Sequence, residues 1–318
     1  MMCKKRQLLF VGGFPSGGTD LLKNILNAHP EVYINGEMPF LYKLAKFGYT
    51  ENSIISSETE YDKFIKLLKN INQWNNFENI NYKPTLYPVN VGMLLYNIFT
   101  LNNSLIWGNK TPQNTENINI LSSIFPNAKF IIIIRDVRDV CLSWKNKWGK
   151  NIYLCAHKWN KRMISINKHE DSDKLLIIKF EDLLSNLEKT TLNITDFLDI
   201  DYSKDMLEYH NHITDIIDGK INYGEKIKTT NHNKWATQFN NKEIERIERI
   251  AFNSMLHFKY PPALARNSKK LNLFEIYTSL FYEVFSTIFI GNRNSKKNTL
   301  KERISFLFFE IKKKITLF

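Results

Sequence analysis

The chain is poor in cysteine. Its three cysteines, Cys3, Cys141 and Cys155, are odd in number, none belongs to a CxxC pair, and no HExxH-type pattern occurs in the 318 residues. Such a set predicts neither a disulfide framework nor a zinc site. We therefore expect a protein of a reducing compartment that requires no metal.

A long uninterrupted hydrophobic run is also lacking. The most apolar stretch, residues 273–288, is broken by Glu275 and Glu283, so it does not have the pattern of a membrane-spanning segment. Residues 1–14 combine basic side chains with a short apolar run, but that run leads directly into a glycine-rich loop, and we expect no signal peptide. These absences predict a cytoplasmic protein.

Acidic residues are too few to balance the basic ones, and the imbalance is local. The formal charge is +12, and residues 266–318 hold eleven Lys and Arg against four acidic residues, a net +7. The rest of the chain is only mildly basic, which argues against a nucleic-acid surface on the main domain. The basic bias belongs to the tail.

The length, with 43% hydrophobic residues, suits an α/β domain at residues 1–262 and a basic amphipathic helical tail at residues 263–318. The tail predicts two helices, the second with a capping box of Thr299 and Glu302. Basic amphipathic helices lie on anionic membranes. Peripheral membrane contact and docking on the domain or on a partner subunit both stay open, as does a homo-oligomer.

The chain is not short of glycine at one place, where four of its twelve glycines fall in the eight residues 12–19 (GGFPSGGT). An apolar run at residues 7–12 predicts a buried parallel strand before this loop, and residues 19–29 predict a helix after it, capped by Thr19. Glycines allow the backbone to approach a ligand, and the helix N-terminus offers free N–H groups. The segment therefore predicts an anion site, most simply for a phosphate.

This loop is not that of a nucleoside triphosphatase. Gly13 and Gly18 have the spacing of a P-loop, but Thr19 and Asp20 stand where that motif needs Lys and then Ser or Thr. A P-loop kinase that depends on ATP and Mg²⁺ is therefore the weakest alternative. An ordinary strand-to-helix turn is the other alternative, although such turns seldom need four glycines.

Two further residues stand near predicted strand ends or turns. Residues 32–35 predict a second strand, after which Glu37 lies between a glycine and Met-Pro, where open α/β sheets place ligands. Residues 41–100 predict helices and loops that would wall an acceptor site. Lys110 lies in a turn-like setting, and from the residues alone exposure to solvent is its default interpretation.

A second strong signal is the apolar run at residues 130–134, typical of a central parallel strand, which is followed directly by Arg135. The chain then turns helical, so that Arg135 at the strand end and Ser143 two helical turns later are placed to bind one phosphate. For Asp136, Arg138 and Asp139 we expect a surface ion-pair cluster that contributes little.

The remaining signals complete the fold. Residues 175–180 predict another buried strand, residues 188–198 and 242–255 predict amphipathic helices, and residues 219–234 form a long polar loop, either a lid or disordered. The predicted fold class is α/β, with a P-loop-containing parallel sheet flanked by helices.

At this point the motifs resemble a known family. Residues 10–22 (FVGGFPSGGTDLL), followed by AHP at 28–30 and by Gly36-Glu37, resemble the 5′-phosphosulfate loop and catalytic Glu of sulfotransferases that use 3′-phosphoadenosine 5′-phosphosulfate (PAPS). Residues 134–143 resemble the 3′-phosphate motif, and residues 179–183 (KFEDL) resemble a third family segment. The resemblance runs from about residue 8 to residue 262 and is greatest to the branch of tyrosylprotein sulfotransferases and their bacterial relatives.

The resemblance implies a role for each matching residue. Glu37 would be the base that takes the proton of the acceptor hydroxyl, and Lys110 would stabilise charge on the transferred sulfuryl group. Lys234 matches less well and would close over the cosubstrate. The implied residues for the 5′-phosphosulfate are Pro15, Ser16, Gly17, Gly18, Thr19 and Asp20, and those for the 3′-phosphate are Arg135 and Ser143. The acceptor would be a hydroxyl of a carbohydrate, a peptide tyrosine or a small metabolite, and no metal is required.

Two residues depart from the family pattern in the loop. Ser16 replaces an arginine, and Asp20 replaces a hydroxyl near the bound anion. An Asp20 that faced the phosphosulfate would repel it, whereas one that faced away would favour the helix dipole. The departures leave open a second interpretation, a catalytically weak or inactive protein with this fold that binds nucleotide or a membrane or protein partner.

Overall fold

The computed structural model describes residues 6–38, 41–71, 82–100, 104–211 and 228–289. The chain divides into two compact units. The first comprises Met1–Ile134 and Ser165–Thr229, and the second comprises Arg135–Ile164 and Thr230–Phe318. The domain boundary expected at residue 262 stays a prediction. The two units meet in the sequence at other positions, and much of the tail lies outside the described residues.

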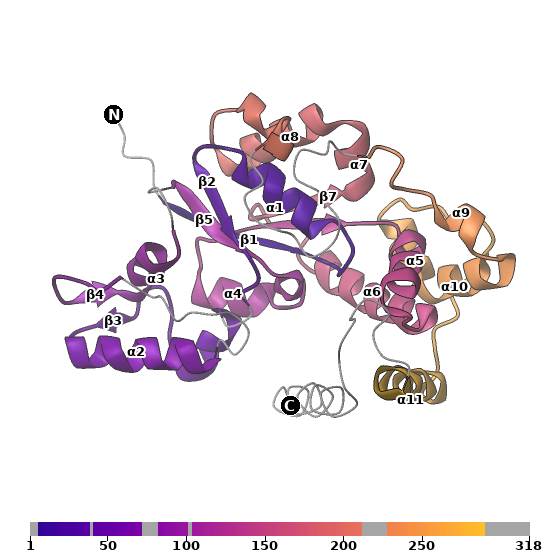
Figure 1. Cartoon of the computed structure of the whole chain (residues 1–318), viewed down its shortest axis with the longest axis horizontal. Helices are drawn as coiled ribbons and strands as arrows, with labels where there is room; N and C mark the ends of the chain where they lie inside the picture. Colours follow the sequence, from indigo (N-terminus) through magenta and orange to yellow (C-terminus); the bar gives the residue numbers. More distant parts are fainter. Residues whose placement is uncertain (1–5, 39–40, 72–81, 101–103, 212–227, 290–318) are drawn as a thin grey trace. The chain divides into compact units, whose positions relative to one another are not determined.

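The first unit is built on a five-stranded sheet with the order β2-β5-β1-β6-β7, in which every pairing is parallel (Figure 1). This arrangement confirms the predicted fold class. The strands are β1 (Gln7–Gly13), β2 (Val32–Asn35), β5 (Ile106–Lys110), β6 (Lys129–Ile134) and β7 (Leu175–Lys179).

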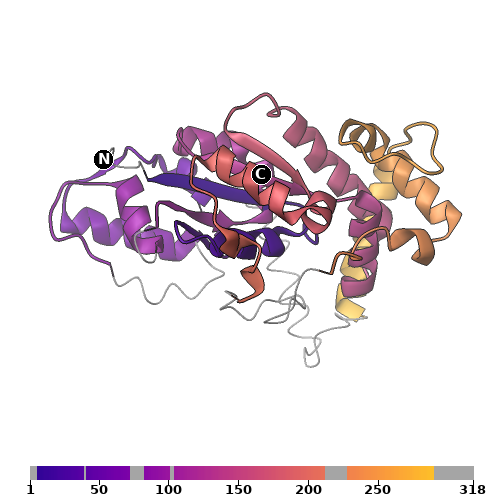
Figure 2. The ribbon, with the colours of Figure 1, turned by 90° about the horizontal axis from the view of Figure 1, so that it is seen from above.

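Alternate residues of the central strands pack on opposite faces of the sheet, as the period of two requires. Leu9 and Val11 of β1 join the core under α1, α7 and α8, whereas Leu8 and Phe10 join the core formed with α2, α3 and α4. Figure 2 shows helices on either side of the sheet. The helices are α1 (Thr19–Asn27), α2 (Glu58–Ile71), α3 (Val91–Phe99), α4 (Ile118–Ile124), α7 (Phe180–Ser185) and α8 (Leu187–Leu198). The sheet is therefore buried on both sides, which explains its uninterrupted apolar strands.

Strand β5 is the strand of the five-stranded sheet that the sequence does not predict. It is short and contains Gly108 and Asn109, which are uncommon in strands. Gly108 pairs with Leu9 of β1, and a Cβ at position 108 would lie 1.7 Å from the carbonyl oxygen of Leu9. The two strands therefore pair in this register only when residue 108 is glycine.

The region of residues 41–100 is helical in part, as predicted, but it also contains a small antiparallel pair. The pair, β3 (Ile54–Ile55) and β4 (Val89–Asn90), was not predicted, because each strand has only two residues. The shorter turns of this unit are 3₁₀ helices: η1 (Leu41–Phe47), η3 (Pro112–Glu116), η4 (Lys204–Met206) and η5 (Tyr209–Asn211).

The second unit is helical. Its helices are α5 (Val137–Trp148), α6 (Ile152–Asn167), α9 (Trp235–Gln238), α10 (Asn241–His257) and α11 (Leu273–Phe289), with the last three residues of α6 counted in the first unit. The capping box of Asn240 and Glu243 starts α10, which has the extent predicted from its periodicity within two residues. No helix within the described ranges is long and apolar enough to span a bilayer. The second predicted tail helix lies outside those ranges.

Candidate functional site

The glycine-rich loop between β1 and α1 has a left-handed backbone at two positions. Ser16 has φ 67° and Gly18 has φ 100°, and the amide of Gly17 donates a hydrogen bond of 2.8 Å to the carbonyl oxygen of Phe14. A Cβ at position 18 would lie 2.4 Å from the ring of Phe180. Both the conformation and the close ring require glycine at position 18, so the loop is a tightly turned cradle at the helix N-terminus.

The loop corrects one prediction about α1. Gly18, not Thr19, is the N-cap residue, and no side chain caps this helix. Thr19 is the first helical residue and is buried. No side chain accepts a hydrogen bond from the backbone N–H groups in the first turn of α1 as a cap. An anion site at a helix N-terminus uses such N–H groups.

Asp20, Glu37 and Lys110 form the charged centre of the first unit. The Lys110 ammonium lies 2.7 Å from Asp20 Oδ1 and 3.2 Å from Glu37 Oε1. The Lys110 side chain is 8% exposed, whereas those of Asp20 and Glu37 are 42% and 52% exposed. The structure thus brings three residues from the loop helix, the end of β2 and the end of β5 to one point, and we call them the Lys110 centre.

This position overturns the default interpretation of Lys110 as an exposed turn residue. Lys110 is the last residue of the buried strand β5. Burial by itself would lower the pKa of its ammonium, but the Asp20 and Glu37 carboxylates outweigh burial and raise the pKa above its ordinary value. Lys110 is therefore a cation across the physiological pH range, with two carboxylates that share it.

A group of buried polar contacts fixes the segment that carries Lys110. The Asn114 side chain donates to the carbonyl oxygen of Val11 (3.1 Å) and to Asn109 Oδ1 (2.7 Å). The hydroxyl of Thr111 accepts from the amide of Met38 (2.9 Å), the residue after Glu37. Since these contacts link the segment to β1 and to the chain beside Glu37, the geometry of the Lys110 centre is set by the sheet edge.

In the second unit, one asparagine joins two of the predicted cosubstrate residues. A terminal nitrogen of Arg135 donates to the carbonyl oxygen of Asn231 (2.8 Å), and the Lys234 ammonium donates to Asn231 Oδ1 (2.9 Å). Arg135 follows β6 directly, and Lys234 precedes α9. Two cations far apart in the sequence therefore converge on Asn231, a residue that no sequence signal identifies.

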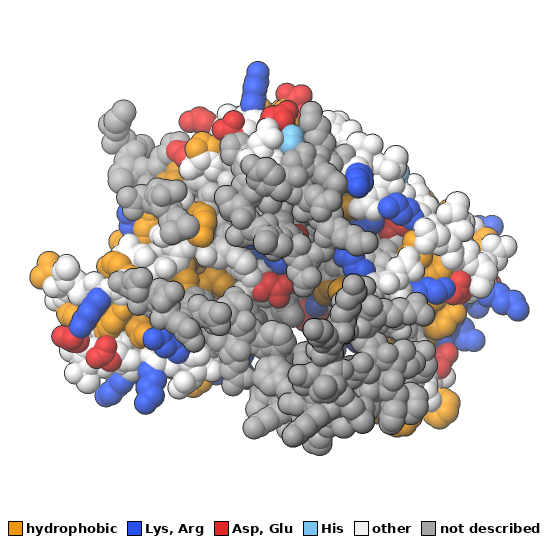
Figure 3. All heavy atoms as spheres, in the orientation of Figure 1, with side chains coloured by type: hydrophobic (Ala, Val, Ile, Leu, Met, Phe, Trp, Pro, Cys, Tyr) orange, Lys and Arg blue, Asp and Glu red, His pale blue; other side chains and the backbone are white. Residues whose placement is uncertain are grey.

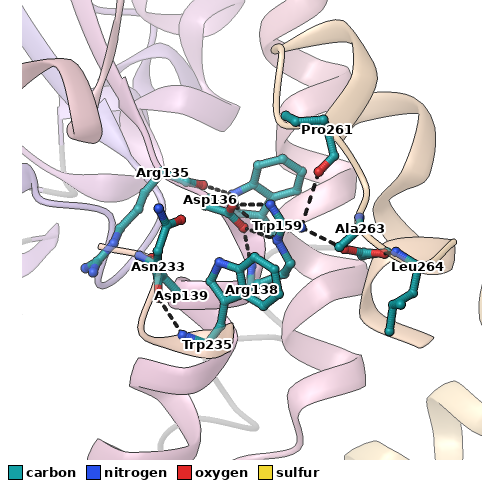
Figure 4. A network of polar contacts seen from close by, with 11 residues as sticks. Arg135, Asp136, Arg138, Asp139, Trp159, Asn233, Trp235, Pro261, Ala263 and Leu264 are labelled. Atoms are coloured by element: carbon teal, nitrogen blue, oxygen red, sulfur yellow. Dashed lines mark hydrogen bonds and ion pairs between the residues drawn. The ribbon is translucent and has the colours of Figure 1, made fainter. Parts of the chain in front are cut away.

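Asp139 holds the same segment. Its carboxylate accepts from the amides of Asn233 (2.7 Å) and Trp235 (3.2 Å), and burial raises its pKa above the ordinary value (Figure 4). Ser143 lies four residues after Asp139 on α5, so the two share a helical face. The predicted 3′-phosphate residues Arg135 and Ser143 are thereby placed on the side of the unit where the segment of residues 231–235 is held.

The prediction of a surface ion-pair cluster at Asp136, Arg138 and Asp139 is wrong. Arg138 makes a forked contact to Asp136 (2.6 Å at the shortest) and a second to Glu248 (2.7 Å), and all three side chains are at most 5% exposed. Glu248 also accepts from the backbone amides of residues 263–265, and the Arg138 guanidinium lies 3.8 Å from the ring centre of Trp235 (Figure 4). The sequence could not show this, because Glu248 lies 110 residues away.

Comparison with known proteins gives a consistent result. The family model described as "Sulfotransferase family" matches residues 9–204. A Caenorhabditis briggsae protein, provisionally named a protein-tyrosine sulfotransferase, is 25% identical over 81% of this chain and 91% of its own length. "Protein-tyrosine sulfotransferase 1" of Danio rerio is 26% identical over 65% of this chain and 57% of its own length.

Solved structures agree at the level of the fold. The sulfotransferase domain of the Synechococcus PCC 7002 olefin synthase aligns with a TM-score of 0.56 and 18% identity, over 82% of this chain and 98% of that domain. The chain spans about half the length of several curated relatives that it matches, between 52% and 57%.

Proposed function

Since the chain belongs to the sulfotransferase family, whose enzymes transfer a sulfuryl group from PAPS to an acceptor, we propose that its acceptor is a phenolic hydroxyl of a peptide tyrosine. The acceptor is supported by the names of two curated relatives, from Caenorhabditis briggsae and Danio rerio, both of which refer to protein-tyrosine sulfotransferases. The observation that supports the chemistry is the Lys110 centre, in which a carboxylate and a buried ammonium meet beside a glycine-rich loop.

The loop fits the phosphosulfate end of PAPS. Its left-handed turn at Gly18 is open only to glycine, and the first turn of α1 has no side-chain cap. We assign the binding of the phosphosulfate to the loop residues Pro15, Ser16, Gly17 and Gly18 and to Thr19 at the start of α1, with Asp20 beside the bound group and in contact with Lys110. When bound, PAPS supplies a sulfuryl group that is activated by its bond to a phosphate.

Glu37 and Lys110 supply the protein's part of the chemistry. Glu37 Oε1 accepts the proton of the acceptor hydroxyl, a role for which its half-exposed position leaves access. Lys110, a fixed cation with little solvent around it, stabilises negative charge on the sulfuryl oxygens, where a low dielectric makes its effect larger than in water. Transfer of this kind depends on position and charge more than on covalent catalysis.

Arg135, Ser143 and Lys234 are proposed to bind the 3′-phosphate end of the same cosubstrate. Support comes from the second unit by itself, where Arg135 and Lys234 converge on Asn231 and Ser143 shares a face of α5 with Asp139. Arginine and hydroxyl groups are the partners that phosphate oxygens prefer.

A two-part experiment tests this function. The product nucleotide, 3′-phosphoadenosine 5′-phosphate, should raise the melting temperature of the protein, with about 2.7 kcal/mol of stabilisation at a hundred times its Kd, while ATP should not. With [³⁵S]PAPS, label should then enter a tyrosine peptide and not the matched phenylalanine peptide. A thermal shift without labelled peptide would retain the cosubstrate and reject the tyrosine acceptor.

A catalytically weak protein with the same cosubstrate is the second candidate. Ser16 stands where the resemblance expects an arginine, and the Asp20 carboxylate forms an ion pair with Lys110. This candidate predicts the thermal shift with the product nucleotide but no transfer to carbohydrate, tyrosine or small-molecule acceptors.

The exposed face of α11 supports a peripheral membrane contact. Leu273, Phe274, Tyr277 and Phe281 are between 68% and 75% exposed, and their helical spacing places them on one side of the helix. Figure 3 shows some hydrophobic side chains (orange) at the lower right, where Figure 1 draws α11. On another side, Glu275 pairs with Arg246 of α10 at 2.6 Å, which fixes α11 with its apolar side outward. We propose that this face lies on an anionic membrane, because the net +7 of residues 266–318 is complementary to such a surface.

Vesicle sedimentation tests the membrane contact. The full chain should bind vesicles that contain phosphatidylserine and not pure phosphatidylcholine, and Phe274→Ser with Phe281→Ser should abolish binding. Leu192→Ser, an exposed apolar residue on α8, is the matched control. Concentration-dependent dimerisation that the double variant abolishes, without vesicle binding, would assign the face to a second copy instead.

A further inference from the structure

Asp20 stands at a position where it competes directly with an incoming anion. It is the second residue of α1, immediately after the glycine-rich loop, and its carboxylate lies 2.7 Å from the Lys110 ammonium. This contact is shorter than the one between Lys110 and Glu37, at 3.2 Å. Of the two carboxylates, Asp20 therefore makes the shorter contact with Lys110.

The charges of the Lys110 centre make this contact consequential. One ammonium faces two carboxylates, so the centre carries a net charge of −1. An ammonium has three donors, and two of them already point to Asp20 and Glu37. A sulfuryl oxygen that approaches Lys110 must therefore compete with two carboxylates for the ammonium and is repelled by their negative charge.

We propose that Asp20 is an internal competitor for Lys110 that weakens the binding of the sulfuryl-bearing donor relative to the product. This inference rests on the proposed function, in which Lys110 faces the sulfuryl group. The sulfuryl group of PAPS must replace the Asp20 carboxylate at Lys110, whereas the product nucleotide lacks that group. Asp20 is 42% exposed, so its side chain has room to turn into solvent when it is displaced.

The consequence is a residue that sets the discrimination between donor and product. A hydroxyl at position 20, as the resemblance expects, would form no ion pair with Lys110. The aspartate makes the chain select less strongly for PAPS over its product. The proposal thus gives a functional consequence to the replacement of a hydroxyl by Asp20 and to the contact of its side chain with Lys110.

The test compares dissociation constants for PAPS and for the product nucleotide, measured by calorimetry on the full chain without acceptor. Asp20→Asn should bind PAPS at least fivefold more tightly and should gain less for the product. Asp62→Asn removes the same charge from α2, on the opposite face of the sheet from α1, and should change neither constant. In a Lys110→Met background, which keeps the length of the side chain, Asp20→Asn should give no gain.

Several results would overturn the proposal. Weaker or unchanged PAPS binding by Asp20→Asn, an equal gain for both nucleotides, or a gain that persists in the Lys110→Met background would each show that Asp20 does not act by competition at Lys110. Binding of neither nucleotide by the wild type or any variant would instead reject the proposed function together with this inference.

Discussion

The two charged clusters of the molecule are built in opposite ways. In the Arg138 network every carboxylate is at most 5% exposed, and the guanidinium, two acids and three backbone amides satisfy one another. In the Lys110 centre one buried ammonium serves two carboxylates that are each about half exposed. The first cluster is closed, whereas the second is open to solvent on its acidic side.

The difference agrees with the proposal that the first cluster stabilises the fold and the second binds a ligand. A buried ion pair costs desolvation and persists only if its remaining hydrogen bonds are made. The Arg138 network meets that condition, because Arg138 also donates to the carbonyl oxygen of Pro261 and Glu248 accepts from three backbone amides. The Lys110 centre has two carboxylates for one ammonium, and both are about half exposed to solvent.

The largest effect is expected from breaking the closed cluster. Glu248→Gln removes the charge that faces Arg138, and loss of one partner of a buried pair typically costs about 3–5 kcal/mol of unfolding free energy. Urea denaturation measures it. The control is Glu245→Gln, in a partly exposed pair with Arg249 on the same helix, which should cost less than about 1 kcal/mol. Equal losses would contradict the contrast between the clusters.

Breaking the open cluster should affect turnover and leave stability almost unchanged. Glu37→Gln removes the proposed base, and general base catalysis typically contributes about 10²-fold or more to the rate, equivalent to ~2.7 kcal/mol. The measurement is kcat with [³⁵S]PAPS beside a urea curve of the same variant. Undiminished turnover would remove Glu37 from the mechanism, and a large loss of stability would place it with the structural charges.

A smaller effect is expected at Asp139, whose buried carboxylate accepts hydrogen bonds from two backbone amides. Asp139→Asn keeps an acceptor oxygen but removes the charge that faces the amides of Asn233 and Trp235, so it should cost less than the roughly 1.5–3 kcal/mol that a hydrogen bond to a charged group contributes. Because the segment carries Lys234, affinity for the product nucleotide should fall severalfold while kcat at saturation stays the same. A fall in kcat alone would contradict a role in holding the segment.

The smallest effect belongs to a surface pair. Partial burial would raise the pKa of Glu243, but hydrogen bonds from Lys145 and from the Asn240 amide lower it below its ordinary 4.5. A lowered pKa gives stability that is present above pH 4.5 and is lost as the pH falls through the folded-state value. Lys145→Met should remove less than about 1 kcal/mol at pH 7 and flatten the pH dependence between pH 5 and 3. Thermal melts across that range measure it, and an unaltered slope would assign the shift to the backbone bond.

The sequence predicts what depends on neighbours along the chain. Strand β6 follows from uninterrupted apolar residues, helix α10 follows from its amphipathic periodicity, and the loop before α1 follows from its glycines. Strand β5 could not be found in this way, because its partner β1 lies about a hundred residues away along the chain. The requirement for glycine at position 108 arises only from that pairing. A short strand with Gly and Asn has no local signature of its own.

The site shows the same limit. Glu37, Lys110 and Arg135 are identified by motif, but the contact of Asp20 with Lys110 depends on which side of α1 faces β5, and no local pattern states this. The burial of Arg138 depends on Glu248, and the convergence of Arg135 and Lys234 depends on Asn231. Each of these contacts joins residues that are 90 or more apart, except the one within the segment of residues 231–234.

Gly108 also determines how this enzyme can be re-engineered. Position 108 lies two residues before Lys110, and any side chain there would collide with the backbone of β1. A library randomised at this position should therefore return only glycine among the folded clones. Gly36 is different, because a Cβ there meets nothing within 4 Å, although it adjoins Glu37. Next to the Lys110 centre there is therefore one position that has room for a side chain, Gly36, and one that has none, Gly108.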